Sequence, residues 1–278
     1  MPLIQTVLRG FSPALLAAGL LAALTSCFTV PETGRSGLAL LPEEQLRAMA
    51  RSSFEELKRR ERIADNPALQ ERIARIGTRI AEVAGTEVPP DEWEFVVFDD
   101  PDQINAFAMP GGKVGLYTGI LKVLESDDEL AAVLGHEVAH VTARHSNQRI
   151  SRQLLVSGLG AALAIGTEDR MDERERELVM AGFGLGATIG VILPYGRTQE
   201  TEADRIGLLY AARAGYDPRA ALQFWQRMSA GDTGSGPPEL LSTHPSDQTR
   251  IQHIREHLPE AIAIYEELLN SYEPPPER

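Results

Sequence analysis

The sequence predicts an α+β fold that is mainly helical, with two well-delimited helices and one small sheet. Apolar residues recur at helical spacing in 126–141, and 197–215 has the start and stop signals of a helix. Three strand-like segments, 93–98, 104–109 and 113–117, are separated by turn residues, with two glycines before the last of them. We therefore expect the sheet to be largely antiparallel.

Length and composition indicate an ordinary globular protein. The chain has 278 residues, of which 43% are hydrophobic and 24% are charged. The formal net charge of -13 argues against nucleic acid or anionic lipid as a partner. We expect a single folded domain at 42–265, followed by a disordered tail at 266–278. The sequence does not predict an oligomeric state.

The N-terminal region predicts export and a lipid anchor. Residues 1–26 are expected to be a signal peptide, because a basic residue precedes an apolar run that is too short to span a bilayer. Residues 24–27, Leu-Thr-Ser-Cys, resemble a bacterial lipobox, so Cys27 is the lipidation candidate and 27–41 a tether; the alternative is a simple secretory signal with an incidental thiol. By analogy with other lipoproteins, Phe28 favours the outer over the inner membrane. The expected location is the periplasmic side of a bacterial membrane, with the lipid as the only attachment.

Two helices are expected before the sheet. Residues 42–63 are charged and rich in helix formers, and Asn66-Pro67 is a start signal for a second helix whose apolar residues recur at helical spacing up to Val83. Gly85 is placed to end that helix. After the last strand, 118–124 is expected to form a short helix beneath the sheet.

The segment 134–140, Leu-Gly-His-Glu-Val-Ala-His, contains the HExxH pattern of zinc hydrolases. His136 and His140 are four residues apart and project from one face of a helix, where two neutral imidazoles can hold Zn²⁺ from adjacent turns. Glu137 is rotated about the helix and reaches a water rather than the metal. The chemistry thus explains the spacing.

Three neighbours of this pattern also carry expectations. Ser126 and Glu129 form a capping box, so the helix is predicted to begin at Ser126. Gly135 has no side chain beside the first histidine, which would let another chain segment or a substrate approach. His145, five residues after the second histidine, is off the ligand face, and we expect it at the surface or at a helix cap.

Two apolar runs rich in Gly and Ala, 154–166 and 178–193, are separated by an almost entirely charged segment. Neither run is long enough to span a membrane, and glycines interrupt both. One interpretation is two closely packed helices, or a helix and a loop, that cover the active-site cleft. The other is a mobile, membrane-contacting lid, because the glycines would permit movement.

A catalytic zinc site needs a third protein ligand, and the helix expected at 197–215 offers two glutamates. Glu200 shares a helix face with small residues and with Asp204, so this face can approach another helix closely, whereas Glu202 points roughly 200° away. We therefore predict Glu200 as the ligand and Asp204 as the acceptor for the other ring N–H of a ligating histidine. The alternative is a solvated acidic helix start.

These motifs resemble those of a known family. Together with 105–112, Asn-Ala-Phe-Ala-Met-Pro-Gly-Gly, and 242–246, Ser-Thr-His-Pro-Ser, they are similar to the gluzincin metallopeptidases. That family is typified by the HtpX heat-shock protease, the CAAX prenyl endopeptidase, and the related periplasmic and mitochondrial quality-control proteases. The resemblance covers residues 66–258. It implies one zinc ion per chain, held by His136, His140 and Glu200, with Glu137 as the general base.

The resemblance also implies roles outside the metal ligands. An edge strand would bind extended substrate by strand addition, through Asn105, Ala106, Phe107 and Ala108. Separately from the resemblance, our hypothesis of the mechanism makes His244, in the His-Pro motif, the best candidate to assist the oxyanion or gate the open metal position, with Tyr195 as a weaker candidate. The alternative for His244 is that it caps the helix that follows.

The chain departs from the family in two respects. HtpX and the prenyl endopeptidase carry transmembrane helices, whereas this sequence offers only the signal peptide and the inferred lipid, so we do not expect an intramembrane cavity. The residues after His244 are too few for the helical repeats of some periplasmic relatives. A minimal, single-domain periplasmic lipoprotein form is therefore predicted.

The resulting expectation is a zinc-dependent endopeptidase of the bacterial cell envelope that cleaves unfolded or misassembled envelope proteins. Two alternatives stay open: a zinc amidase that cuts cell-wall peptides, and a chaperone or assembly factor for envelope proteins with a latent zinc site. A purely structural zinc protein is disfavoured, because Glu137 would have no task and a His/His/Glu set leaves an open coordination position.

Overall fold

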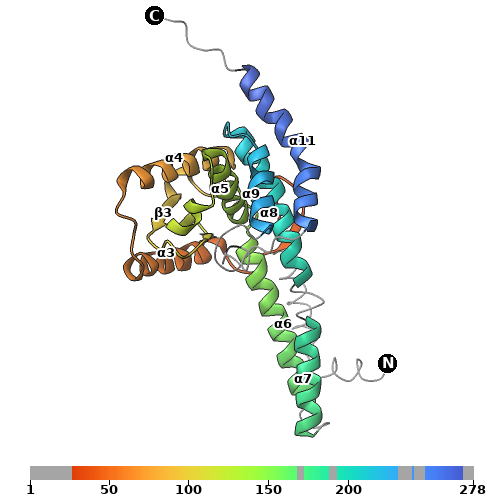
Figure 1. The fold of residues 1–278 in the computed structure, drawn as a ribbon. Helices are drawn as coiled ribbons and strands as arrows, with labels where there is room; N and C mark the ends of the chain where they lie inside the picture. Colours follow the sequence, from red (N-terminus) through yellow and green to blue (C-terminus); the bar gives the residue numbers. More distant parts are fainter. Residues whose placement is uncertain (1–26, 168–171, 188–192, 231–239, 241–247, 272–278) are drawn as a thin grey trace, which may run out of the picture. The chain divides into compact units, whose positions relative to one another are not determined.

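The computed structural model describes residues 27–167, 172–187, 193–230, 240 and 248–271 (Figure 1). The predicted signal peptide, His244 and residues 272–278 of the predicted tail lie outside this part of the chain. The chain divides into two compact units, one made of residues 1–42 and 147–196 and the other of 43–146 and 197–278. The sequence predicted one domain at 42–265, so the separate grouping of 147–196 differs from that expectation.

The second unit contains the sheet and both helices that carry the metal-ligand candidates. Its elements confirm the predicted fold class, which is α+β and mainly helical. In chain order they are α3 (Glu43–Arg60), α4 (Pro67–Val83), β3 (Glu94–Phe98), β4 (Ala106–Met109), β5 (Lys113–Tyr117), α5 (Asp127–Thr142), α8 (Leu193–Arg213), α9 (Arg219–Ser229) and α11 (Gln248–Ser271), with short 3₁₀ turns at Pro90–Glu92 and Thr118–Lys122. Because α11 extends to Ser271, the first residues of the predicted disordered tail are helical.

The three-stranded sheet has the order β3-β5-β4 and is mixed. Strands β4 and β5 are antiparallel, as predicted, and Gly111 and Gly112 join them with φ angles of 76° and 74°, which glycine adopts without steric cost. Strand β3, however, runs parallel to β5. The segment 99–105 carries the chain past the position that β5 later fills, so consecutive strands β3 and β4 are not neighbours. Strand β4 is consequently an edge of this sheet.

Helix α4 covers β3 and forms much of the core of this unit. Asn66 caps it by accepting a hydrogen bond from Leu69 N at 3.1 Å, and Pro67 is its first residue. Its buried face packs against β3, where Gly77 lies directly against the Phe95 ring. Gly85 follows the helix with φ 89°, in agreement with the predicted stop. Two fully buried aromatic residues, Phe54 of α3 and Phe98 of β3, contact each other edge to face.

Helix α5 begins where the capping box predicts. Ser126 Oγ accepts a hydrogen bond from Glu129 N at 3.1 Å, and the Glu129 carboxylate accepts one from Glu125 N at 2.8 Å. Arg227 of α9 lies 2.6 Å from the same carboxylate, which is almost fully buried. The helix is buried along most of its length, so its two histidines lie inside the protein rather than on its surface.

The first unit contains an N-terminal hairpin and two helices. Strands β1 (Cys27–Thr29) and β2 (Ser36–Leu38) are antiparallel, so part of the predicted tether has regular structure. The residues that follow β2 are bound to the start of α6 (His145–Thr167): Leu41 O accepts a hydrogen bond from Asn147 Nδ2 at 2.8 Å, and Leu40 N donates to Ser151 Oγ at 2.8 Å.

The two runs rich in Gly and Ala form α6 and α7 (Glu173–Ala187), which lie side by side (Figure 1). A Cβ atom at Gly160 would lie 3.1 Å from Cε1 of Phe183, so the two helices pack closely at this glycine. No helix in the described ranges is long and apolar enough to cross a bilayer. Two packed helices are one of the predicted interpretations, and a lid function stays a prediction.

Candidate metal centre

Helices α5 and α8 cross at two glycines. A Cβ atom on Gly207 would lie 2.8 Å from the backbone nitrogen of His136, and one on Gly135 would lie 2.8 Å from the carbonyl oxygen of Gly207. Both neighbours are backbone atoms, which cannot rotate away as the end of a side chain could. A side chain larger than hydrogen at either position would therefore push the helices apart. The sequence predicted that Gly135 leaves room for another segment, and that segment is α8. The close crossing brings Glu200 next to the histidines.

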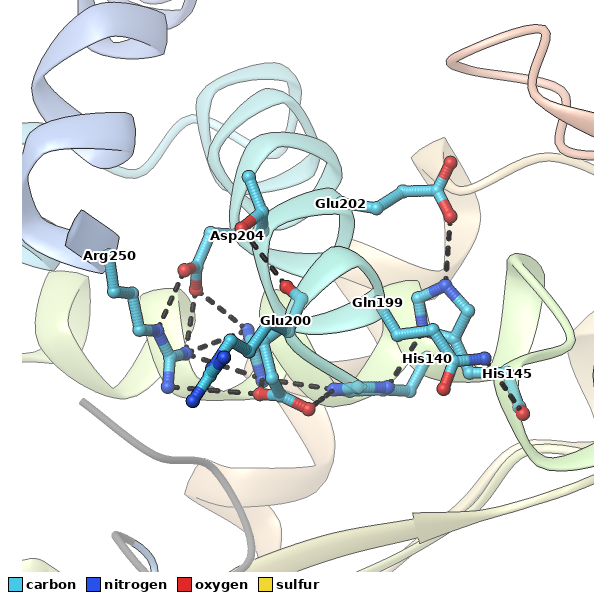
Figure 2. A network of polar contacts seen from close by, with 10 residues as sticks. His140, His145, Gln199, Glu200, Glu202, Asp204 and Arg250 are labelled. Atoms are coloured by element: carbon cyan, nitrogen blue, oxygen red, sulfur yellow. Dashed lines mark hydrogen bonds and ion pairs between the residues drawn. The ribbon is translucent and has the colours of Figure 1, made fainter. Parts of the chain in front are cut away.

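Side chains of His136, His140 and Glu200, from these two helices, converge at one point. Figure 2 labels His140 and Glu200 within the surrounding polar network. The Nε2 atoms of His136 and His140 are 3.0 Å apart. The Glu200 carboxylate oxygens lie 3.3 Å from His136 Nε2 and 3.5 Å from His140 Nε2. Within the described residues, this is the one group of three or more His, Cys, Asp or Glu side chains that could hold a metal ion.

The donor set fits zinc. Zn²⁺ takes imidazole nitrogen and carboxylate oxygen at about 2.0–2.2 Å in a tetrahedral arrangement, which places neighbouring donors roughly 3.3 Å apart. The three observed separations, 3.0, 3.3 and 3.5 Å, lie around that value. Imidazole ligands favour Zn²⁺ over Mg²⁺ or Ca²⁺, which prefer oxygen. Three protein ligands leave a fourth position for water or substrate.

Asp204 and Glu200 set the protonation of His136. Asp204 Oδ1 lies 3.0 Å from His136 Nδ1, which is where the sequence predicted a carboxylate acceptor. Burial and the Arg250 charge act to lower the pKa of His136, but hydrogen bonds to Asp204 and Glu200 outweigh them and raise it to about 9. In the metal-free protein His136 is therefore protonated at neutral pH, and metal binding must displace that proton.

Arg250 of α11 completes this side of the centre. Its Nε and Nη2 atoms each donate to a different oxygen of Asp204 at 2.7 Å, and the side chains of both residues are buried. Burial acts to raise the pKa of Asp204, but Arg250 and His136 together hold it below its usual range. Asp204 thus stays ionised and binds His136 on one side and Arg250 on the other.

His145 lies on the opposite side of the centre, next to His140. The sequence analysis expected it at the surface or at a helix cap; the surface position is wrong, because His145 is 2% exposed. Helix α5 ends at Thr142, and Arg144 adopts a left-handed conformation with φ 52°. The chain therefore turns at this point, and His145, the first residue of α6, returns toward His140 instead of continuing the α5 helix.

His140 is the less basic of the two histidines. Burial lowers the pKa of His140 well below its usual value, although Glu200 acts in the opposite direction. Its Nδ1 atom lies 2.8 Å from Nδ1 of His145. In the metal-free protein this imidazole is neutral at neutral pH, and its Nε2 atom faces the other two candidate ligands.

The remaining predicted site residues are placed as follows. Glu137 is buried on α5 with 2% exposure. Asn105 is buried just before β4, and Ala106, Phe107 and Ala108 lie within this edge strand. Cys27 is exposed at the start of β1 in the first unit. His244 lies outside the described residues, and so does the side chain of Tyr195. Their roles in catalysis, substrate binding and lipidation stay predictions.

Sequence reasoning missed Arg250, Trp225 and Gln199, which also lie in or around the centre. Arg250 and Trp225 come from helices that carry no recognised motif, so only their meeting in three dimensions reveals them. Gln199 Nε2 donates to the His145 carbonyl oxygen at 3.1 Å, and it directly precedes the predicted ligand. A search for polar residues adjacent to Glu200 would have found Gln199 but not its partner.

Comparison with known proteins identifies the family. The model of peptidase family M48 matches residues 67–258. The mitochondrial metalloendopeptidase OMA1 of Schizosaccharomyces pombe is 40% identical over 190 residues, which cover 68% of this chain and 53% of that protein. The mitochondrial metalloendopeptidase OMA1 of Homo sapiens is 33% identical over 254 residues, 85% of this chain and 47% of that protein. The beta-barrel assembly-enhancing protease of Escherichia coli is 29% identical over 257 residues, 86% of this chain and 51% of that protein.

The chain thus spans about half the length of the relatives it matches. A particular likeness to HtpX or to the CAAX prenyl endopeptidase stays a prediction. The family match begins at the start of α4 and includes both helices that carry the candidate ligands. The chain belongs to peptidase family M48, a family of metallopeptidases.

Proposed function

We propose that this protein is a zinc-dependent endopeptidase of the bacterial cell envelope that cleaves unfolded or misassembled envelope proteins. The observation that carries the proposal is the convergence of His136, His140 and Glu200 at separations suited to tetrahedral zinc. Membership of family M48 supports peptide-bond hydrolysis. The similarity to beta-barrel assembly-enhancing proteases supports a role in the envelope.

The residues of this chain would divide the chemistry between them. Zinc, when bound, would act as a Lewis acid toward the scissile carbonyl and lower the pKa of water at the open position. Glu137 would accept the proton of the attacking water and deliver it to the leaving amine. Asp204 would orient His136 and increase its strength as a ligand. His244 remains the candidate to assist the oxyanion or to gate the open position.

Strand β4 would bind the substrate. It pairs with β5 along one side and is an edge of the three-stranded sheet, so an extended peptide could add to it as a further strand. Strand addition uses main-chain hydrogen bonds, and it therefore suits a protease that accepts many unfolded sequences. A photoreactive residue introduced at Ala108 should crosslink to casein in a Glu137→Gln background. One introduced at exposed Arg51 of α3 should not.

Cys27 would attach the protein to the membrane through a lipid. The residue is exposed, which suits modification, and it begins the strand β1. Mass spectrometry of the N-terminal peptide tests this part of the proposal directly. The unsubstituted protein should be found in the outer-membrane fraction. The Cys27→Ser variant should be lost from that fraction. Retention of the variant in the membrane fraction would show that another segment anchors the chain.

The central experiment is the substitution Glu137→Gln in the full chain. The variant should fold and bind one zinc ion per chain, because Glu137 is not a predicted ligand, yet it should fail to hydrolyse denatured casein. A matched control is Glu71→Gln, at an exposed position of α4, which should leave both zinc content and hydrolysis unchanged. Full activity in Glu137→Gln would refute the assignment of the general base.

Two alternatives are distinguished by the substrate and by the conditions of activity. A cell-wall amidase would digest purified cell wall and not denatured protein. A chaperone or assembly factor with a latent zinc site would still support envelope assembly as the Glu137→Gln variant, and its hydrolysis would appear only under stress or with a partner. Identification of the envelope proteins that accumulate with Glu137→Gln would name the physiological substrates.

A further inference from the structure

His145 lies between a candidate metal ligand and a buried carboxylate. Its Nδ1 atom is 2.8 Å from Nδ1 of His140, and its Nε2 atom is 3.0 Å from Oε2 of Glu202. His145 and Glu202 are only 2% and 7% exposed. Figure 2 shows this pair at one end of the polar network and Arg250 with Asp204 at the other. Glu202 is the carboxylate that helical geometry alone placed away from the metal.

The proton positions in this chain of contacts follow from the acceptor at its end. An ionised carboxylate only accepts hydrogen bonds, so His145 Nε2 carries a proton and donates it to Glu202. In a neutral His145, Nδ1 is then a lone-pair acceptor, and the contact to His140 requires that His140 Nδ1 carries the proton. The lone pair of His140 is consequently on Nε2, the atom that faces His136 and Glu200.

Three features hold His145 in this place independently of a metal. The left-handed backbone at Arg144, with φ 52°, reverses the chain just before it, a conformation that costs a non-glycine residue free energy. Two hydrogen bonds from the Arg144 guanidinium to Glu87 Oε2, at 3.0 and 2.7 Å, stabilise that turn. Gln199 binds the His145 carbonyl oxygen at 3.1 Å, while Glu202, three residues further along α8, binds its ring.

We propose that His145 and Glu202 are positioning residues that fix His140 as the Nδ1–H tautomer and direct its Nε2 lone pair at the metal. The inference rests on the proposed zinc site. Three carboxylates within residues 200–204 of α8 would then have separate roles. Glu200 joins the ligand group, Asp204 orients His136 directly, and Glu202 orients His140 through His145. A carboxylate that orients a ligating imidazole commonly changes metal affinity by roughly 10–100-fold when it is removed.

Two amide substitutions of His145 distinguish its effect on the orientation of His140 from its hydrogen bond to Glu202. The amide of Asn occupies the place of Nδ1 in histidine, so His145→Asn can still accept the His140 proton. The amide of Gln reaches the place of Nε2, so His145→Gln can still donate to Glu202 but has no acceptor for His140. Zinc affinity is measured for the full chain by competition with a chelator of known affinity, and stability by thermal unfolding of the metal-free protein.

The proposal predicts that His145→Gln binds zinc roughly 10–100-fold more weakly, whereas His145→Asn stays close to the unsubstituted protein. The order should be reversed for metal-free stability, because His145→Asn leaves the buried Glu202 without its ring partner. The control His253→Gln, on the partly exposed His253 of α11, should change neither quantity. Unchanged zinc affinity in His145→Gln, or equal weakening in both variants, would overturn the positioning role.

A spectroscopic measurement tests the same point without substitution. In the zinc-loaded full chain, ¹⁵N NMR of the histidines should show a proton on Nδ1 of His140 that is coupled to Nδ1 of His145. A proton on His140 Nε2, or a metal bound at His140 Nδ1, would overturn the inference while leaving a zinc enzyme intact. If the unsubstituted chain bound no zinc, the proposed function itself would fail, so the two failures are distinguishable.

Discussion

The guanidinium of Arg250 lies over the indole ring of Trp225, with its Cζ atom 3.6 Å from the ring centroid. The same guanidinium binds both carboxylate oxygens of Asp204 at 2.7 Å, and Asp204 in turn binds His136. Helix α11 therefore acts on the candidate metal centre through this arginine, and Trp225 of α9 also lies against the His136 ring, with the two ring centroids 6.0 Å apart. Neither helix supplies a predicted metal ligand within the described residues, but both determine where Asp204 and His136 lie.

Substitution of Arg250 by lysine should show this coupling. Lysine keeps the charge but lacks the planar fork that binds both oxygens of Asp204, and it stacks less well on Trp225. Removing one partner from a buried ion pair costs about 3–5 kcal/mol, and a lysine that retains part of the pairing should cost less than that. We expect a lower free energy of unfolding and weaker zinc binding, measured by denaturant titration and chelator competition.

The matched control for that experiment is Arg205→Lys. Arg205 is paired with Glu260 at 3.4 Å, and the two side chains are 34% and 48% exposed. An exposed pair contributes about 0–1 kcal/mol, so the control should unfold nearly as the unsubstituted protein does and bind zinc equally well. If Arg250→Lys had the same stability and zinc affinity as this control, the contacts of Arg250 would not contribute to the position of Asp204 or His136, and the prediction would be wrong.

The glycine crossing of α5 and α8 yields a second prediction. A methyl group at Gly207 would lie 2.8 Å from His136 N and 2.9 Å from the carbonyl carbon of Gly135, so Gly207→Ala must push the helices apart. Overpacking of this kind costs about 1–3 kcal/mol, and with backbone on both sides we expect the upper part of that range. Because Glu200 moves away from the histidines, the zinc content of the purified variant should fall as well.

Gly158→Ala provides the control for this prediction. Gly158 is within α6, and no heavy atom lies within 4 Å of a Cβ atom built there. Alanine is favoured over glycine in helices by about 1 kcal/mol, so this variant should be at least as stable as the unsubstituted protein. Normal zinc content and stability in Gly207→Ala would mean that the two helices can move apart without loss of free energy, and the predicted effect of the close crossing would be wrong.

The helices and the grouping of the three candidate ligands could be predicted from the sequence, because patterns within single helices indicate them. Helical spacing placed His136 and His140 on one face, and the small residues beside Glu200 predicted the close crossing that the structure contains. Ser126 and Asn66 marked helix starts that the structure confirms. In each case the pattern that supports the prediction lies within a few consecutive residues or on one face of one helix.

The features that sequence reasoning missed depend on contacts between distant segments. The turn at Arg144 contains no glycine or proline that would indicate it in the sequence. Helical spacing extended through Arg144 therefore predicted the wrong position for His145. The expected largely antiparallel sheet did not include the parallel pairing of β3 with β5, which arises because β5 lies between the consecutive strands β3 and β4. Arg250 reaches the centre from a helix that begins more than thirty residues after α8 ends.

A third prediction concerns the ligand choice between Glu200 and Glu202. Glu200→Gln should lose most bound zinc, because a neutral amide is a poor ligand for this cation, and its oxygens are the ones within 3.5 Å of both imidazoles. Glu202→Gln should retain one zinc per chain with lower affinity, since it acts only through His145. Metal analysis after dialysis checks both variants. Equal zinc loss from the two substitutions would reject Glu200 as the distinct ligand.

Removal of the metal gives the fourth prediction. A chelator should abolish hydrolysis of casein and lower the unfolding temperature, because zinc at a thousand-fold excess over its Kd contributes about 4 kcal/mol to stability. The metal-free chain should nevertheless stay folded. His136 is then protonated, since hydrogen bonds to Asp204 and Glu200 outweigh burial and raise its pKa to about 9, and its charge lies against both carboxylates in place of the metal.

Circular dichroism and thermal unfolding of the chelated protein test this outcome. Added zinc should restore activity and the original unfolding temperature, whereas magnesium should not, because two of the three donors are imidazole nitrogens. The variant Glu200→Gln is the informative comparison, since it lacks one of the two carboxylates that balance His136 in the metal-free state. It should therefore be less stable than the chelated unsubstituted protein, and complete unfolding of both on chelation would show that zinc alone holds α5 and α8 together.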